Sequence, residues 1–284
     1  MISSVGLWWV AVLVAGLPGT WAAGSDAALR QVRAQHSSVE LIVADEEPDR
    51  ERGLWIGVRF RLDPGWHIYW KNPGDSGLPP SVNWQLPPGV RAAEFEWPAP
   101  ERIPVDPLVN YGYSGEAVLP VRLTFSCEFP SGTMKIGASL RWLVCHETCI
   151  PDKASLQILL PLGEPDRRQL PEWRRQVMEA RNKVPRPLPK SWKTGAVSRA
   201  EVFVISVRMD RPAPEKALFF PSDVGQVNDS APQEVVAVGR DLKITLRKSD
   251  QLSSEPRALR GVLTFPTGES YAAEFPLRPD EGAR

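Results

Sequence analysis

The chain has 284 residues, enough for one large domain or two modest ones. Hydrophobic residues make up 42% of it and charged residues 24%, a composition typical of a globular protein that disfavours intrinsic disorder. The 34 basic and 34 acidic side chains cancel, so neither a nucleic-acid partner nor a charged membrane-surface patch is indicated. The 29 prolines and 21 glycines favour many short strands and turns over long helices.

The N-terminus is typical of a secretory signal peptide. Leu7–Leu17 is an apolar run that is too short for a membrane span, which needs about 20 residues. Thr20 and Ala22 place small residues at positions −3 and −1 of a cleavage after Ala22. The residues before the run carry no Lys or Arg, so an uncleaved anchor or a buried core segment is the alternative. We expect residues 1–22 to be removed and the mature chain to be periplasmic, with no membrane span.

Residues 25–163 are predicted to form a β-sandwich. From Leu54 to Leu62 every second residue is apolar, which gives a strand with one buried face. Lys71–Pro80 is rich in Gly and Pro and is expected to be a long loop. Short strands separated by turn signals favour a sandwich of the immunoglobulin type. The other expected strands are Trp66–Trp70, Ser81–Leu86, Ala92–Trp97, Glu116–Phe125, Met134–Val144 and Lys153–Leu160.

A helical linker, residues 164–190, is expected to separate this domain from a second and smaller β domain. Trp173, Val177 and Ala180 share one face of a helix predicted over Glu172–Lys183, which the following prolines end. Residues 191–284 contain neither Cys nor His, so a structural or docking role is expected for them. The strands expected there are Ala200–Met209, Ala217–Pro221, Glu234–Val238, Asp241–Arg247, Gly261–Phe265 and Tyr271–Leu277.

Chemistry is expected at the pair Cys145 and Cys149. A disulfide between them requires a turn, because residues four apart in an extended strand are about 13 Å apart. A bridge across so short a loop removes little chain entropy, so the spacing favours a redox pair over a structural disulfide. A metal site is the third possibility. Cys127 ends a strand and is expected to be a lone packed thiol.

The residues beside the cysteine pair do not settle its thiol pKa or its role, and two other roles, a Cu(I) site and an inert link, stay open. Protonated His146 would lower the pKa of a thiol, whereas Glu147 would raise it, and the net shift does not follow from the sequence. The two thiolates with His146 or His67 could instead hold Cu(I), which favours soft ligands. The pair could also be an inert link in a docking module.

Four segments resemble one family of proteins. The chain is similar to the N-terminal periplasmic region of the DsbD/ScsB thiol:disulfide interchange family, and closest to its ScsB-like branch. The resemblance rests on Gly65–Gly77, Trp97–Arg102, Asn110–Glu116 and Trp142–Pro151, in that order over about 100 residues.

This resemblance implies an immunoglobulin-like fold with the pair on a β-hairpin. It implies that Cys149 forms mixed disulfides with partners and that Cys145 resolves them. Val105–Tyr113 resembles a cap loop that shields the pair in the family. Residues assigned to tuning or capping by analogy are His67, Tyr69, Leu108, Val109, Asn110 and Tyr111.

The resemblance also implies partners. Electrons would come from a thioredoxin-like domain and pass to a periplasmic disulfide isomerase or ScsC-like protein, which makes the chain a component of a protein-disulfide reductase. No thioredoxin-like or membrane segment follows the second β domain, so we expect the donor to be a separate membrane reductase. The exchange needs no cofactor and no metal.

Overall fold

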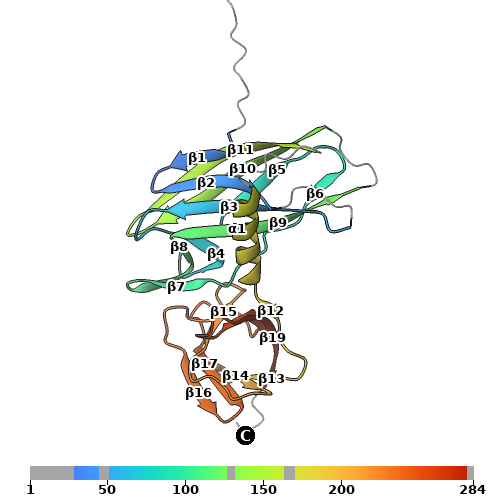
Figure 1. Ribbon diagram of the computed structural model, residues 1–284. Helices are drawn as coiled ribbons and strands as arrows, with labels where there is room; N and C mark the ends of the chain where they lie inside the picture. Colours follow the sequence, from blue (N-terminus) through green and yellow to red (C-terminus); the bar gives the residue numbers. More distant parts are fainter. Residues whose placement is uncertain (1–28, 45–50, 127–131, 163–169, 280–284) are drawn as a thin grey trace, which may run out of the picture.

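The computed structural model describes residues 29–44, 51–126, 132–162 and 170–279. The expected signal peptide and Cys127 lie outside these ranges. Within them the regular structure is β apart from α1 (Leu170–Asn182), which stands beside the larger β region (Figure 1). No described helix has the length and apolar character needed to cross a membrane.

The N-terminal region is a sandwich of two antiparallel sheets, as predicted. The register is fixed by alternation of side chains between the core and the outer face. The first sheet has the order β1 (Gln31–Ala34), β2 (Ser37–Val43), β3 (Leu54–Leu62), β9 (Glu116–Phe125) and β6 (Val90–Ala92). The second has the order β11 (Cys149–Pro161), β10 (Thr133–Cys145), β4 (His67–Gly74), β8 (Leu108–Ser114) and β7 (Glu101–Val105), with β5 (Ser81–Gln85) also paired to β10.

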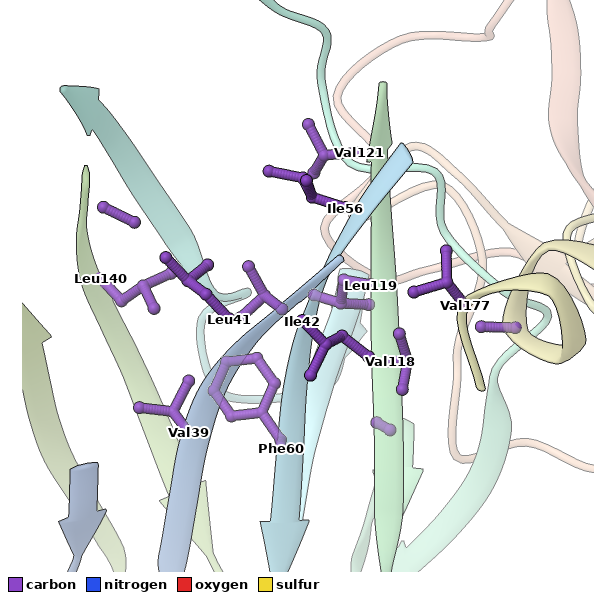
Figure 2. Close-up of a cluster of buried hydrophobic side chains, with 14 of the residues drawn as sticks. Val39, Leu41, Ile42, Ile56, Phe60, Val118, Leu119, Val121, Leu140 and Val177 are labelled. Atoms are coloured by element: carbon purple, nitrogen blue, oxygen red, sulfur yellow. The ribbon is translucent and has the colours of Figure 1, made fainter. Parts of the chain in front are cut away.

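The two sheets enclose one hydrophobic core. Phe60 on β3 meets Trp142 on β10 edge to face with ring centroids 5.6 Å apart, and the Trp142 indole N–H donates to Ser37 Oγ at 3.2 Å. These contacts join the sheets across the sandwich. Figure 2 shows part of the core, including Val39, Leu41, Ile42, Ile56, Phe60, Val118, Leu119, Val121, Leu140 and Val177.

Helix α1 covers the outer side of the first sheet. Trp173, Val177 and Ala180 are buried on one face, as their spacing predicts. A Cβ atom at Gly57 on β3 would lie 2.8 Å from the Val118 side chain on β9 and 3.0 Å from that of Val177 on the helix, so the close packing there favours glycine.

The C-terminal region has its own core, built by a sheet that curls on itself (Figure 1). Strand β13 runs parallel to the end of β19 and thereby joins the layers. The sheet has the order β15 (Leu218–Pro221), β18 (Ala258–Thr264), β19 (Ser270–Pro279), β13 (Lys193–Ser198), β14 (Val202–Arg208), β17 (Asp241–Arg247) and β16 (Glu234–Val238), with β12 (Arg186–Pro187) paired to β19.

Two local predictions were wrong. Lys71–Gly74 is not loop, because β4 continues to Gly74 through an irregularity in its pairing with β8. Residues 93–97 are not strand, and the short β6 precedes them. The segment expected to be a cap loop, Val105–Tyr113, is built mainly of strand. It is most of a hairpin in which β7 and β8 meet at the tight turn Asp106-Pro107.

The two β regions are joined by buried polar bonds. The Tyr111 hydroxyl donates to Asp229 Oδ1 at 3.0 Å, and Asn72 Nδ2 donates to the Pro221 carbonyl at 2.8 Å. Phe220 of the C-terminal region packs edge to face on Tyr111 and belongs to the N-terminal core. The regions are therefore in specific contact and not merely tethered.

Asp229 should make the stability of this contact depend on pH. It is 6% exposed, and burial raises its carboxyl pKa from 3.8 to about 6, against the hydrogen bond from Tyr111. A raised native pKa means that the folded state binds more protons than the unfolded state between these values. Its contribution to stability is complete below pH 4 and is lost as pH rises through 6.

We therefore expect the unfolding free energy of the native chain, relative to Asp229→Asn, to fall by about 2–3 kcal/mol between pH 4 and pH 7. Burial lowers the pKa of His67, so His67 makes stability rise with pH. This contribution is the same in both proteins and cancels when they are compared. Urea unfolding at several pH values measures the difference. A difference that is flat with pH would contradict the expectation.

Candidate functional site

The two cysteines close the tip of the β10–β11 hairpin. The ladder runs from Thr133–Pro161 to Cys145–Cys149, so the cysteines are the last cross-strand pair. They form a disulfide with Cα atoms 4.2 Å apart. His146, Glu147 and Thr148 supply the turn, in which the His146 amide donates to the Thr148 carbonyl at 3.3 Å. The expected turn and hairpin are both present.

Burial distinguishes the two cysteines. Cys145 is 1% exposed, because β4 pairs with it through His67. Cys149 and the three turn residues are exposed. The disulfide therefore joins one residue at the surface, Cys149, to one that is covered, Cys145.

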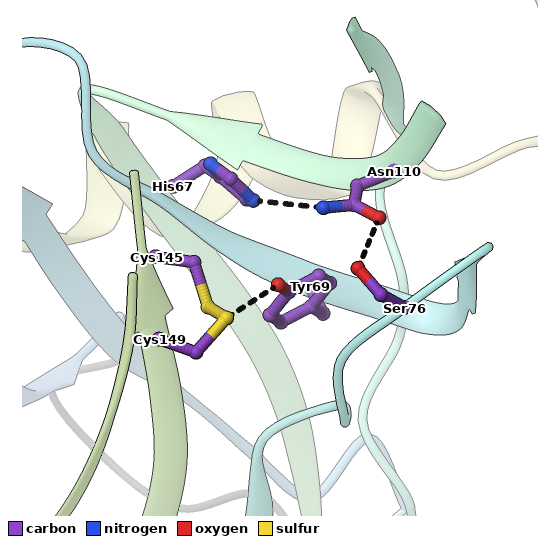
Figure 3. The surroundings of a disulfide bond; sticks show 6 residues. All are labelled: His67, Tyr69, Ser76, Asn110, Cys145 and Cys149. Carbon is purple, nitrogen blue, oxygen red and sulfur yellow. Dashed lines mark hydrogen bonds between the residues drawn. A yellow bond between two sulfur atoms is a disulfide. The ribbon is translucent and has the colours of Figure 1, made fainter. Parts of the chain in front are cut away.

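Tyr69 is the side chain that reaches the disulfide from β4. Ile68 and Trp70 point into the core, so the alternation of the strand turns His67 and Tyr69 to the other side. The ring of Tyr69 is fully buried, and its hydroxyl lies 3.3 Å from Cys149 Sγ (Figure 3). Burial raises the phenol pKa above its ordinary value, and a hydrogen bond with Ser76 opposes this. The phenol stays protonated and can donate to sulfur.

His67 belongs to the same cluster. Its ring meets that of Tyr69 edge to face at 5.2 Å, and its Nε2 lies 3.3 Å from Asn110 Nδ2. Ser76 Oγ donates to Asn110 Oδ1 at 2.9 Å, which leaves the amide nitrogen to donate to the imidazole (Figure 3). Burial, with a smaller effect of His146, lowers the pKa of His67. His67 is therefore neutral near pH 7.

The segment expected to be a cap has one side chain that contacts the disulfide cluster and one that contacts the C-terminal region. Asn110 faces the cluster around the disulfide, as Figure 3 shows. The Tyr111 hydroxyl is bonded to Asp229 in the C-terminal region. Val109 is buried, and Leu108 is 39% exposed at the β7–β8 turn.

Sequence reasoning missed an aromatic stack beside the hairpin tip. His36 stacks on Trp66 with centroids 3.9 Å apart, and Trp66 lies 5.9 Å from the His146 ring. His36 Nδ1 also lies 3.2 Å from Asp63 Oδ2, and the Arg33 guanidinium holds the pKa of Asp63 below its usual range. The sequence offered one signal, which is that the chain has only three histidines. The structure brings all three to the end of the sandwich that carries the disulfide.

Sequence reasoning also did not single out Ser76 and Gly77, which contact Asn110 and Tyr69. Both lie in a segment whose glycines and prolines indicate only a loop. Glu147 is exposed in the turn. Among the described residues, no three of the His, Cys, Asp and Glu side chains gather in a group that could hold a metal ion.

Comparison with known proteins identifies the N-terminal sandwich. Residues 38–161 match the sequence model of a family described as thiol:disulfide interchange protein DsbD, N-terminal. No curated protein matches the chain in sequence. Among solved structures, the N-terminal periplasmic domain of ScsB from Proteus mirabilis aligns with a TM-score of 0.68 and 22% identity, over 86% of this chain and 94% of that one. The human desmocollin-1 ectodomain aligns with a TM-score of 0.22 and 7% identity, over 82% of this chain and 46% of that one.

Proposed function

We propose that the chain, whose residues 38–161 match the DsbD N-terminal family model, relays electrons by thiol–disulfide exchange through Cys145 and Cys149. The observation that supports this most directly is a disulfide at a hairpin tip with one buried and one exposed sulfur-bearing residue. Exchange requires one sulfur that a partner can reach and a second sulfur within bonding distance that the partner cannot reach.

The exchange proceeds in two steps. In the reduced protein the Cys149 thiolate attacks a partner disulfide, and one partner sulfur leaves as a thiolate. The Cys145 thiolate then attacks Cys149 Sγ, and the second partner sulfur leaves. Two electrons pass to the partner, which gains two thiols, and the Cys145–Cys149 disulfide forms. Because both cysteines share one hairpin, the second step is effectively intramolecular and fast.

Tyr69 supports the first step. A phenol that donates to Cys149 stabilises negative charge on its sulfur. The thiolate is the attacking species, so this contact favours the first step. His67 packs on the Tyr69 ring and is itself bonded to Asn110, and these contacts help to hold the ring in this position.

The setting of the reaction is also part of the proposal. We propose that the chain is exported, that a thioredoxin-like domain of a separate membrane reductase reduces it, and that it reduces a periplasmic disulfide isomerase or an ScsC-like protein. The domain limits assigned from the sequence, 25–163 and 191–284, are part of this proposal.

Trapping with Cys145→Ala tests the function. This variant should accumulate mixed disulfides through Cys149, because the resolving sulfur is gone, and they should appear as reducible adducts on non-reducing gels. The matched Cys149→Ala variant should accumulate none. Adducts on Cys149→Ala alone would reverse the roles, and adducts on neither would contradict the proposal.

The alternative Cu(I) role predicts a different result. A copper protein would purify under reducing conditions with close to one Cu(I) per chain and would lose it in the double Cys→Ser variant. That result, together with an absence of adducts, would replace the exchange function.

A further inference from the structure

The contacts between the two β regions converge on one part of the N-terminal sandwich. Arg102 Nη2 on β7 donates to the carbonyls of Asp229 and Ser230 at 3.2 and 3.1 Å. Tyr111 on β8 donates to the Asp229 carboxylate, and Ser230 Oγ donates to Asp75 Oδ2. All three N-terminal residues lie on or beside the β4–β8–β7 edge of the second sheet.

The C-terminal residues form a compact turn, Asn228–Ala231. The Ala231 amide donates to both the carbonyl and Oδ1 of Asn228, at 3.2 and 2.9 Å. The side chain of Asn228 thus stabilises the turn from inside. The turn presents Asp229 and Ser230 to the sandwich in a fixed geometry.

The segments that this turn holds also contact the side chains around the redox centre, Tyr69 and His67. We call Asp75–Gly77 and Val109–Tyr111 together the cover. Its two parts are bonded to each other, because the Asp75 amide donates to the Val109 carbonyl at 3.0 Å and the Val109 amide to Asp75 Oδ2 at 2.8 Å. Asp75 Oδ2 therefore accepts two hydrogen bonds, one from the Val109 amide within the cover and one from the Ser230 hydroxyl of the C-terminal turn.

The cover reaches the disulfide through short contacts. Ser76 is bonded to Asn110, and Asn110 to His67. A Cβ atom at Gly77 would lie 2.1 Å from Tyr69 Cζ, so the backbone of Gly77 rests on the ring whose hydroxyl touches Cys149 Sγ. A shift of the cover would displace the side chain that contacts the exposed sulfur.

We propose that the C-terminal β region positions the cover, so that its Asn228–Ala231 turn controls how readily thiols react at Cys149. The proposal rests on the exchange function argued above. Asp229 and Ser230 are positioning residues that act through Tyr111 and Asp75, and the step they control is attack on Cys149 by an incoming thiolate.

The test uses the full chain and a small dithiol, dithiothreitol, as the probe. In the double variant Asp229→Ala/Ser230→Ala, the rate constant for reduction of the disulfide should rise about three- to tenfold, the factor expected for an opening equilibrium that loses about one buried hydrogen bond. Hydrogen exchange at the amides of Asp75 and Val109 should rise with it.

The control is Asp210→Ala. Asp210 also lies in the C-terminal region and accepts bonds from an aromatic side chain and a serine, Trp192 Nε1 at 3.0 Å and Ser191 Oγ at 2.7 Å, away from the cover. Its reduction rate should stay within about twofold of the native rate. If the double variant does not fold, Tyr111→Phe replaces it, with Tyr113→Phe, which loses a buried bond to the Pro98 carbonyl, as its control.

The outcomes are distinct. An unchanged rate in the double variant overturns the positioning role, and so does an equal rise in Asp210→Ala, which would reflect general loosening. A native disulfide that dithiothreitol does not reduce would instead contradict the exchange function itself.

Discussion

The Glu40→Ala variant is expected to lose about 3–5 kcal/mol of unfolding free energy. Glu40 and Arg59 are cross-strand partners on β2 and β3, and each is 5% exposed. Arg59 bonds Glu40 Oε2 through Nη2 and Gln176 Oε1 on α1 through Nη1, the latter at 2.6 Å. Removal of the carboxylate leaves a guanidinium buried under the helix without its counter-charge. Equilibrium urea unfolding measures the loss.

Glu116→Ala is the matched control. Glu116 pairs with Arg61 on the same sheet at 2.9 Å, but both side chains are more than 40% exposed. Such a pair contributes about 1 kcal/mol or less. Losses of similar size in the two variants would show that burial does not set the strength of these pairs. Restoration of stability by Glu40→Leu combined with Arg59→Met would show that the cost lies in the unpaired charge.

The strand pattern of the sandwich could be predicted because its residues alternate simply. Leu54–Leu62 and Glu116–Phe125 were predicted with the bounds that the structure has. The continuation of β4 to Gly74 could not be predicted, because glycine and proline disfavour regular structure locally and pairing with β8 overrides them. The strand β13 was also missed, because its residues, Lys-Thr-Gly-Ala-Val-Ser, show little apolar alternation, although it pairs with β14 and β19.

The redox pair could be placed from local spacing, whereas its surroundings could not. Cys145 and Cys149 are four residues apart, and the turn between them follows from chain geometry. The resemblance brought Tyr69 near the pair, and the structure shows the contact with Cys149 Sγ. The bond between Ser230 and Asp75 joins residues 155 apart, and nothing in either local sequence indicates it. Tertiary contacts of this kind require the fold.

Gly77→Ala is expected to disturb both stability and the redox centre. Gly77 has φ +98, and a Cβ atom there would lie 2.1 Å from Tyr69 Cζ. The ring cannot retreat easily, because it is fully buried and His67 packs on it. Backbone strain and overpacking together should cost about 2–4 kcal/mol. Relief by displacement of Gly77 and Tyr69 would loosen the contact of Tyr69 with Cys149 Sγ, so reduction by dithiothreitol should also become faster.

Gly115→Ala separates the two causes. Gly115 also has positive φ, at +67, but a Cβ atom there would meet nothing within 4 Å. It should lose only the cost of backbone strain, about 1 kcal/mol, and keep the native reduction rate. Thermal unfolding and the rate of reduction by dithiothreitol, measured on both variants, distinguish backbone strain from the contact with Tyr69. Equal effects at the two sites would mean that the contact of Gly77 with Tyr69 does not control the exposed sulfur, because strain alone would then account for the result.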